Sequence, residues 1–138
     1  ERGSILANLV GAMERQIEEV IAHATKRHQF RNAISKFQSV QNRIVDMKLR
    51  WETSRLLLYK VAWAKQTKGT AAMEAALAKL YLSESFVANS QNAVVLNGGY
   101  GFMTDREVER DFRDAVGSLL YSGTSDIQRT IVSRALGL

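Results

Sequence analysis

The 138-residue sequence contains no cysteine and no proline. Without cysteine the chain has no disulfide framework and no thiolate for catalysis or for binding zinc. Without proline, and with few clusters of glycine, its helices can run for many turns without a break. No apolar run approaches the roughly 20 residues that cross a membrane as a helix, and no targeting segment is visible. We therefore expect a cytoplasmic protein.

The composition is that of a folded domain. Hydrophobic residues make up 46% of the sequence, too high a fraction for a wholly disordered chain. The length suits one domain with a core of its own, so we treat residues 1–138 as a single domain. Because the sequence starts at Glu1, without Met and directly in a helical pattern, we interpret it as a piece of a longer protein.

Positive charge is concentrated in the first half of the sequence. Residues 1–69 contain 13 Lys and Arg against 6 Asp and Glu, whereas residues 70–138 contain 6 against 8. A basic half suits a polyanionic partner such as a nucleotide cofactor, or it is simply the solvated face of helices, which is the more common case. We do not expect nucleic acid as a partner.

Apolar residues recur at helical spacing along most of the chain, and no segment reads as a confident strand. The pattern predicts five helices, over residues 3–25, 35–68, 70–96, 104–113 and 125–136. The first three are long, and the third is rich in alanine, so that a neighbouring helix can approach it closely. We therefore predict an all-α protein, an antiparallel four-helix bundle of long helices with an additional short helix.

Three of the predicted helices begin at a pair of residues typical of a capping box, in which two side chains bond reciprocally to backbone N–H groups. The pairs are Ser35 with Gln38, Thr104 with Glu107, and Ser125 with Gln128. Within the second helix, apolar residues follow 3-4 spacing from Phe37 to Val61, and this stripe predicts the face that packs in the core.

Three loops between the helices are candidates for function. Arginines flank Phe30 in the first loop, a pattern that suits recognition of a phosphate or planar ring, although a plain surface loop is the more common explanation. Residues 97–101 contain three glycines, which let a ligand approach the backbone or simply end a helix. Residues 123–126 expose a helix N-terminus that binds an anion or is only capped. Because His23 and His28 stand apart from other ligands, no metal site is expected.

Four stretches match, in order and spacing, the signatures of one family. Residues 27–38 (RHQFRNAISKFQ) resemble R-x-x-F-G-x-x-I-x-x-F-Q. Residues 93–101 (AVVLNGGYG) resemble a segment ending in G-G-x-G, and residues 108–115 (VERDFRDA) resemble V-E-R-x-x-R-D-A. Residues 121–129 (YSGTSDIQR) resemble Y-E-G-T-S-E-I-Q-R. Together these stretches resemble the C-terminal helical domain of an acyl-CoA dehydrogenase.

The resemblance implies a longer flavoenzyme, with an N-terminal helical domain and a middle β-domain that this chain lacks. Family members bind FAD, usually assemble as tetramers that are dimers of dimers, and pass electrons to an acceptor such as an electron-transfer flavoprotein. A carboxylate base removes the α-proton of an acyl thioester while the β-hydride passes to flavin N5, which gives the α,β-enoyl thioester. The present chain alone is then expected to be inactive.

The resemblance also implies roles for individual residues. The positions that match cofactor contacts are Arg27, Phe30, Gln38, Val95, Leu96, Gly98, Gly99, Thr124 and Asp126. The positions that match the substrate-facing wall are Arg2, Tyr121, Ser122 and Gly123. In the family the backbone N–H at the position of Ser122 polarises the thioester carbonyl, which makes the α-proton more acidic.

Three residues depart from the family pattern. Arg31 and Val95 replace a common glycine and a common glutamine. Ser122 replaces the catalytic glutamate of many members, and a serine hydroxyl without a partner cannot be a general base at neutral pH. Some members carry the base on the first helix of this domain, at a position that Glu1 matches, so we predict Glu1 as the base. The alternatives are a relative that acts on carrier-protein-bound acyl or aminoacyl thioesters, and a non-catalytic flavin- or nucleic-acid-associated relative.

Overall fold

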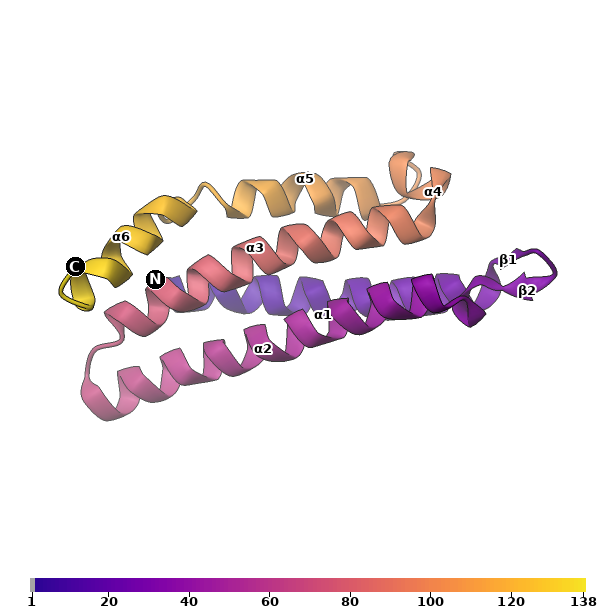
Figure 1. The fold of residues 1–138 in the computed structure, drawn as a ribbon. Coiled ribbons are helices and arrows are strands. Elements are labelled where there is room, and N and C mark those ends of the chain that lie inside the picture. Colours follow the sequence, from indigo (N-terminus) through magenta and orange to yellow (C-terminus); the bar gives the residue numbers. More distant parts are fainter. Residues whose placement is uncertain (1) are drawn as a thin grey trace.

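The computed structural model describes residues 2–138, and the side chains of residues 5–138. Three long helices dominate it: α1 (Arg2–Lys26), α2 (Gln38–Lys68) and α3 (Ala72–Asn97). Each runs antiparallel to the one before it, so that α1 and α3 point the same way, and each follows the predicted range closely (Figure 1). Gly69 ends α2 in the left-handed conformation, with φ of 73°, which is why the chain turns there.

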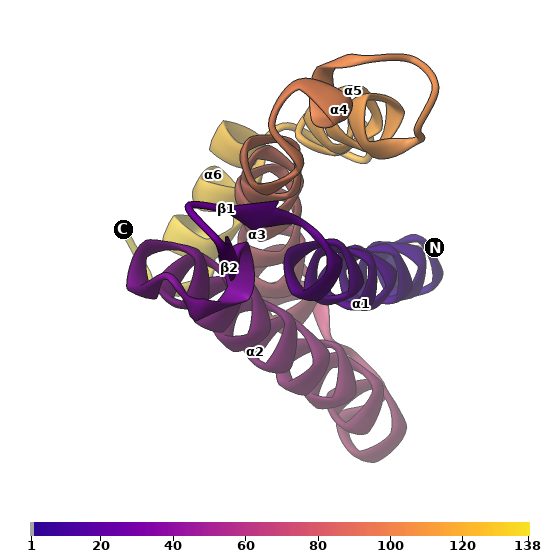
Figure 2. The same ribbon diagram turned by 90° about the vertical axis from the view of Figure 1, so that its right-hand side faces the viewer.

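The fourth member of the bundle is made of two shorter helices, α5 (Val108–Ser118) and α6 (Ser125–Ala135), which follow one another along α3. Seen from the end, α3 lies at the centre and the other helices surround it (Figure 2). A single turn of helix, α4 (Gly99–Phe102), joins α3 to the loop before α5. The predicted all-α bundle is therefore confirmed, with its fourth member broken after Ser118.

A small hairpin connects α1 to α2, where no strand was predicted. Strands β1 (His28–Gln29) and β2 (Asn32–Ala33) pair antiparallel, and a 3-10 turn, η1 (Ile34–Lys36), follows. Phe30 and Arg31 form the tip, with φ of 50° and 68°. Two consecutive positive φ angles are typical of a two-residue type I′ turn, which explains why a glycine is favoured at the position of Arg31.

Each of the three predicted capping boxes is wrong in detail. Ser35 lies inside η1, so α2 begins after Phe37, and no side chain caps it. Glu107 is itself the residue before α5, and Thr104 caps nothing there. Helix α6 is capped one residue earlier than predicted, because the Thr124 hydroxyl accepts the N–H of Ile127 at 3.4 Å.

The core lies between α1, α2 and α3 and extends under α5. The apolar stripe of α1 is buried from Leu6 to Val20, and Met47, Trp51 and Val61 of the predicted α2 stripe are buried as well. The other stripe residues of α2 are more open: Phe37, Val40, Ile44 and Leu58 are only half-buried. No helix in the described part of the chain is long and apolar enough to cross a membrane.

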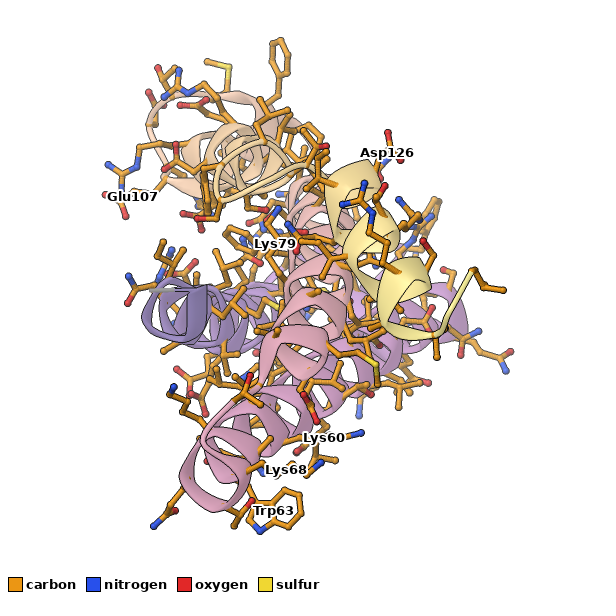
Figure 3. The ribbon with its side chains drawn as sticks, turned by 90° about the vertical axis from the view of Figure 1, so that its left-hand side faces the viewer. Lys60, Trp63, Lys68, Lys79, Glu107 and Asp126 are labelled. Carbon is orange, nitrogen blue, oxygen red and sulfur yellow. The ribbon has the colours of Figure 1, made fainter. Side chains whose placement is uncertain are left out.

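Helix α2 also carries a second apolar row, which the core stripe does not include. Its members are spaced three, four or seven residues apart and are all more than half exposed: Val45, Leu49, Leu56, Tyr59 and Trp63. The Trp63 side chain points away from the bundle (Figure 3). A row at this spacing occupies one side of the helix, so α2 is apolar on two sides, and residues 5–138 cover only one of them.

Candidate functional site

The hairpin end of the bundle carries a cavity of about 510 Å³. Arg27, which lies between the end of α1 and the first strand of the hairpin, lines one side of this cavity. His23, one helical turn earlier in α1, lines the same side. The opposite side is the end of α3 and the glycine loop, residues 95–99, with Tyr100. Segments about 70 residues apart in the sequence thus form one pocket, and the cofactor candidates Arg27, Val95, Leu96, Gly98 and Gly99 meet there.

A second cavity of about 480 Å³ adjoins the first and shares the residues Gln29, Ile34, Val95 and Leu96 with it. Phe30 lines this cavity, although 86% of its surface is exposed. Its ring meets that of Phe37 edge to face, with 6.3 Å between the centroids. Arg43 of α2 completes the lining, so the cavity combines aromatic rings with a guanidinium.

The electrostatics of this end favour an anion. Burial and the nearby positive charges of Arg106 and Arg27 lower the pKa of His23 below its usual value, so the imidazole is neutral at pH 7. Arg106 stacks over the Tyr100 ring at 4.6 Å, beside the same loop. A dianionic group such as a diphosphate would offset the repulsion between these cations and accept hydrogen bonds from Arg27.

The glycine loop exposes its backbone. Gly98 ends α3 with φ of 58°, and its N–H and carbonyl are hydrogen-bonded within the turn. Gly98 and Gly99 are exposed, and a Cβ atom on either would meet nothing within 4 Å, so a ligand can approach the backbone from this side. Gly101 serves packing instead: a Cβ there would collide with the backbone carbonyl oxygen of Val94. The loop is therefore a helix terminator and at the same time a place where a ligand can reach the backbone.

The remaining candidates gather at the turn between α5 and α6. Ser122 has φ of 57° and Gly123 has φ of 94°, so the backbone reverses sharply there. Among the described residues, the backbone N–H of Ser122 donates to no acceptor. Burial, and then the charge of Asp114, raise the pKa of the Tyr121 hydroxyl, which stays protonated. Asp126 lies in the first turn of α6 and is exposed.

The structure does not bring all candidates together. Helix α5 separates the hairpin end from the turn at Ser122, and its 11 residues span about 16 Å. Figure 1 shows the two places well apart along the bundle. Gln38 is exposed at the start of α2 and lines neither cavity. Glu1 lies outside the described residues, and for Arg2 only the backbone, at the start of α1, is described.

Three of the residues that lie at these sites were not predicted from the sequence. His23 lies one helical turn before Arg27, a spacing that indicates a shared face. Lys79 is a single lysine in an apolar stretch of α3, and it is only 1% exposed. Gln128 was assigned to a capping box, whereas it is fully buried and bonds to the turn before α6. Among the described residues, no group of His, Asp and Glu could hold a metal ion.

Comparison with known proteins identifies the family of this chain. Residues 1–137 match the family model described as "Acyl-CoA dehydrogenase, C-terminal domain". The chain is 41% identical to the L-prolyl-[peptidyl-carrier protein] dehydrogenase of Pseudomonas fluorescens, over the whole of this chain and 36% of that protein. The chain belongs to the acyl-CoA dehydrogenase family, and the resemblance of its four motifs is confirmed.

Two solved structures share the fold closely. The prolyl acyl carrier protein oxidase AnaB superposes with a TM-score of 0.96 at 50% identity, covering 99% of this chain and 36% of that one. The FAD complex of PigA has a TM-score of 0.96 at 39% identity, covering 100% of this chain and 36% of that one. The present chain thus spans about a third of the length of these relatives.

Proposed function

We propose that this chain is the C-terminal helical domain of a longer FAD-dependent dehydrogenase that oxidises an acyl thioester to the α,β-enoyl thioester. An N-terminal helical domain and a middle β-domain would make up the length by which the relatives exceed it. The observation that carries the proposal is the turn at Ser122, because its unengaged N–H can donate to a thioester carbonyl. The family membership of residues 1–137 supports it.

The residues at the hairpin end fit FAD. The diphosphate would lie against Arg27 and the open backbone of Gly98 and Gly99, where no Cβ atom is in the way. Phe30 would lie against a planar part of the cofactor. FAD supplies, when bound, the acceptor for the hydride that leaves the substrate β-carbon. The observation in favour of this ligand is a pair of adjoining cavities that together present a guanidinium, an exposed aromatic ring and glycine backbone.

One cofactor would draw on two copies of the chain. Thr124 and Asp126 lie at the α5–α6 turn, about the length of α5 away from Arg27 and Phe30. We assign these two sets to FAD molecules that are shared between subunits, as the resemblance implies. The protein would then be a homo-oligomer, a dimer or a dimer of dimers, whose sites are complete only in the assembly.

The second apolar row of α2 is the surface that we assign to subunit contacts. Its five residues are all more than half exposed, and Leu56, Tyr59 and Trp63 form a continuous strip within it. Large exposed apolar residues aligned on one helix face mark a contact surface more often than a solvated one. A second copy of the same chain, with the same row, would bury it symmetrically.

The proposed reaction needs a base and an electrophilic contact from this chain. Glu1 would accept the α-proton, because the family chemistry requires a carboxylate and Ser122 cannot provide one. The Ser122 N–H would hold the thioester oxygen as negative charge develops on it. Tyr121 and Gly123, with Arg2, would form the wall beside the acyl group. Tyr121 keeps its proton through this step, since its pKa is raised.

The acyl group of the substrate is a thioester either of coenzyme A or of a carrier protein. The similarity to an L-prolyl-[peptidyl-carrier protein] dehydrogenase at 41% identity and to a prolyl acyl carrier protein oxidase at 50% identity favours a thioester held on a carrier protein. We therefore propose a carrier-bound prolyl thioester as the first substrate to test, with acyl-CoA thioesters second. Electrons would pass to an electron-transfer flavoprotein or to dioxygen.

The test is flavin bleaching by the full-length protein. Purified protein with its FAD is mixed anaerobically with prolyl-carrier protein, butanoyl-CoA and isovaleryl-CoA, and the flavin absorbance is followed. Rapid bleaching by one of them supports the proposal and identifies the carrier. Reoxidation is then compared in air and with an electron-transfer flavoprotein. A flavoprotein that none of these thioesters bleaches would indicate the non-catalytic alternative, and isolated residues 1–138 should show no activity.

A further inference from the structure

Two buried polar side chains hold the turn that carries Ser122. Lys79 of α3 donates from Nζ to the backbone carbonyl oxygen of Ser118 at 2.8 Å. Gln128 of α6 donates from Nε2 to the carbonyl oxygens of Ser122 and Gly123, at 3.1 and 2.9 Å. Both side chains are fully buried; Lys79 comes from α3, which packs against α5 and α6, and Gln128 comes from α6, which follows the turn.

Lys79 fixes the end of α5, just before the turn. Ser118 is fully buried at the last position of α5, where a backbone carbonyl has no further helical partner. An ammonium group at this end also interacts favourably with the helix dipole. The Nζ atom lies 5.9 Å from the centre of the Tyr121 ring, so the same lysine is also within cation–π range of a side chain of the turn. Figure 3 shows Lys79 inside the bundle, between α3 and the α5–α6 side.

Gln128 fixes the other end of the turn. A Cβ atom on Gly123 would lie 2.7 Å from Gln128 Nε2, so only glycine lets the amide come this close. The other amide atom, Oε1, is buried and has no donor among the described residues. The contribution of Gln128 to the structure therefore rests on the two hydrogen bonds that it gives to the turn. An apolar side chain of similar size could fill the same space but could not make them.

We infer that Lys79 and Gln128 are positioning residues for the proposed reaction, because together they fix where the backbone N–H of Ser122 points. This inference rests on the proposed function, in which that N–H holds the thioester oxygen. Ser122 is a non-glycine residue with φ of 57°, a conformation that costs energy unless its surroundings hold it. Gln128 donates a hydrogen bond to the carbonyl oxygen of Ser122. This bond limits rotation of the backbone at Ser122, and with it the direction of the Ser122 N–H.

The consequence is a dependence of the chemical step on residues that never touch the substrate. A hydrogen bond to a developing oxyanion is sensitive to angle and distance, and removing such a donor costs about 10²–10³-fold in rate. A shift of about 1 Å in a positioned group costs up to about 10²-fold. Loss of one anchor should therefore slow the reaction without removing a group that binds FAD.

The experiment compares three variants of the full-length flavoprotein: Gln128→Leu, Lys79→Met and, as the matched control, Gln16→Leu. Gln16 is another fully buried glutamine, and it bonds to Ser90 at 2.7 Å, away from the turn. Each variant is tested for flavin content and melting temperature, for the rate of flavin reduction, and for the infrared carbonyl band of the bound thioester. The probe is the thioester that reduces wild-type flavin fastest, labelled with ¹³C at the carbonyl and bound to dithionite-reduced protein.

We expect Gln128→Leu and Lys79→Met to slow flavin reduction by about 10–100-fold and to return the carbonyl band toward its frequency in water. Gln16→Leu should keep the wild-type band and rate at a comparable loss of melting temperature. A wild-type band and rate in Gln128→Leu would overturn the inference, as would an equal loss in Gln16→Leu. If Lys79→Met does not fold, Gln128→Leu decides. If the unmutated protein is reduced by no thioester, the proposed function fails first, and this inference fails with it.

Discussion

Arg15 and Asp111 join the first helix to the fifth through a single guanidinium nitrogen. Nη2 of Arg15 donates to both carboxylate oxygens of Asp111, at 2.9 and 2.8 Å. Asp111 is only 7% exposed, and Gln16 lies beside it with Nε2 at 3.5 Å. The hydrogen bond to Asp111 is the main reason that the pKa of Arg15 is raised. The acidic helix α5 is thus held on the bundle by a buried charge, not only by apolar packing.

Asp111→Ala should destabilise the bundle by about 2–3 kcal/mol, because a buried carboxylate with charge-assisted hydrogen bonds is lost. Urea unfolding of residues 1–138, followed by circular dichroism, measures the difference. The control is Glu19→Ala, which removes the exposed Arg15–Glu19 pair at 3.0 Å and should cost less than about 0.5 kcal/mol. Equal losses for the two variants would mean that the Asp111 pair adds no more than a surface pair.

Replacing either of two glycines by alanine should change the stability of the chain, but in opposite directions. Gly11 lies in the exposed part of α1, and a Cβ there would meet nothing within 4 Å. Gly11→Ala should therefore stabilise the chain by about 0.5–1 kcal/mol through helix propensity. Gly101→Ala should destabilise it, since the added methyl would collide with the Val94 carbonyl oxygen. Thermal unfolding of both variants tests this, and a stabilised Gly101→Ala would show that α4 is free to move away from α3.

The long helices could be predicted from the sequence because their apolar residues repeat at a spacing that only a helix places on one side. The hairpin at Phe30 and Arg31 could not, because its strands are two residues each and carry no apolar alternation, and it depends on two positive φ angles. The capping boxes failed for a related reason. A Ser or Thr followed three residues later by Glu or Gln is common, and tertiary contacts decide whether those side chains reach the backbone.

The candidate site was predictable only through the family motifs. Arg27 and the glycine loop are about 70 residues apart, and no local pattern indicates that they share a cavity. Lys79 and Gln128 escaped detection because their partners are backbone carbonyls, which carry no sequence signal. A lone lysine inside an apolar stretch was the one available hint, since a lysine is rarely buried unless its charge is compensated.

His23 should make the chain less stable in mild acid. Its pKa is lowered in the folded state, first by burial and then by Arg106 and Arg27, so the unfolded chain binds the proton more readily. Stability is then full above the ordinary value of 6.5 and falls as the pH drops through the lower folded pKa. His23→Asn should flatten the dependence of the unfolding free energy on pH between about 7 and 5. The exposed His28→Asn is the control, and a flattening by that variant instead would reject the assignment.

The second apolar row of α2 should drive self-association. Leu56→Glu should shift residues 1–138 toward the monomer in sedimentation equilibrium at tens of micromolar, because a charge would be buried in the contact. The control is Leu136→Glu, since Leu136 and Leu56 are both 63% exposed but lie on different surfaces. An oligomer that survives Leu56→Glu, or one that is lost equally with Leu136→Glu, would place the contact elsewhere.

Glu1 should accept the α-proton of the substrate in the full-length protein. The base must be a carboxylate near the substrate α-carbon, and the most common family position for it is occupied by Ser122. Glu1→Gln should slow flavin reduction by about 10²–10⁴-fold while FAD content and thioester affinity stay close to wild type. Glu14→Gln, at an exposed position of α1, is the matched control and should retain the wild-type rate. Adding Ser122→Glu to Glu1→Gln should restore part of the rate, because the family uses either position for the same proton. Wild-type flavin reduction in Glu1→Gln would exclude Glu1 as the base.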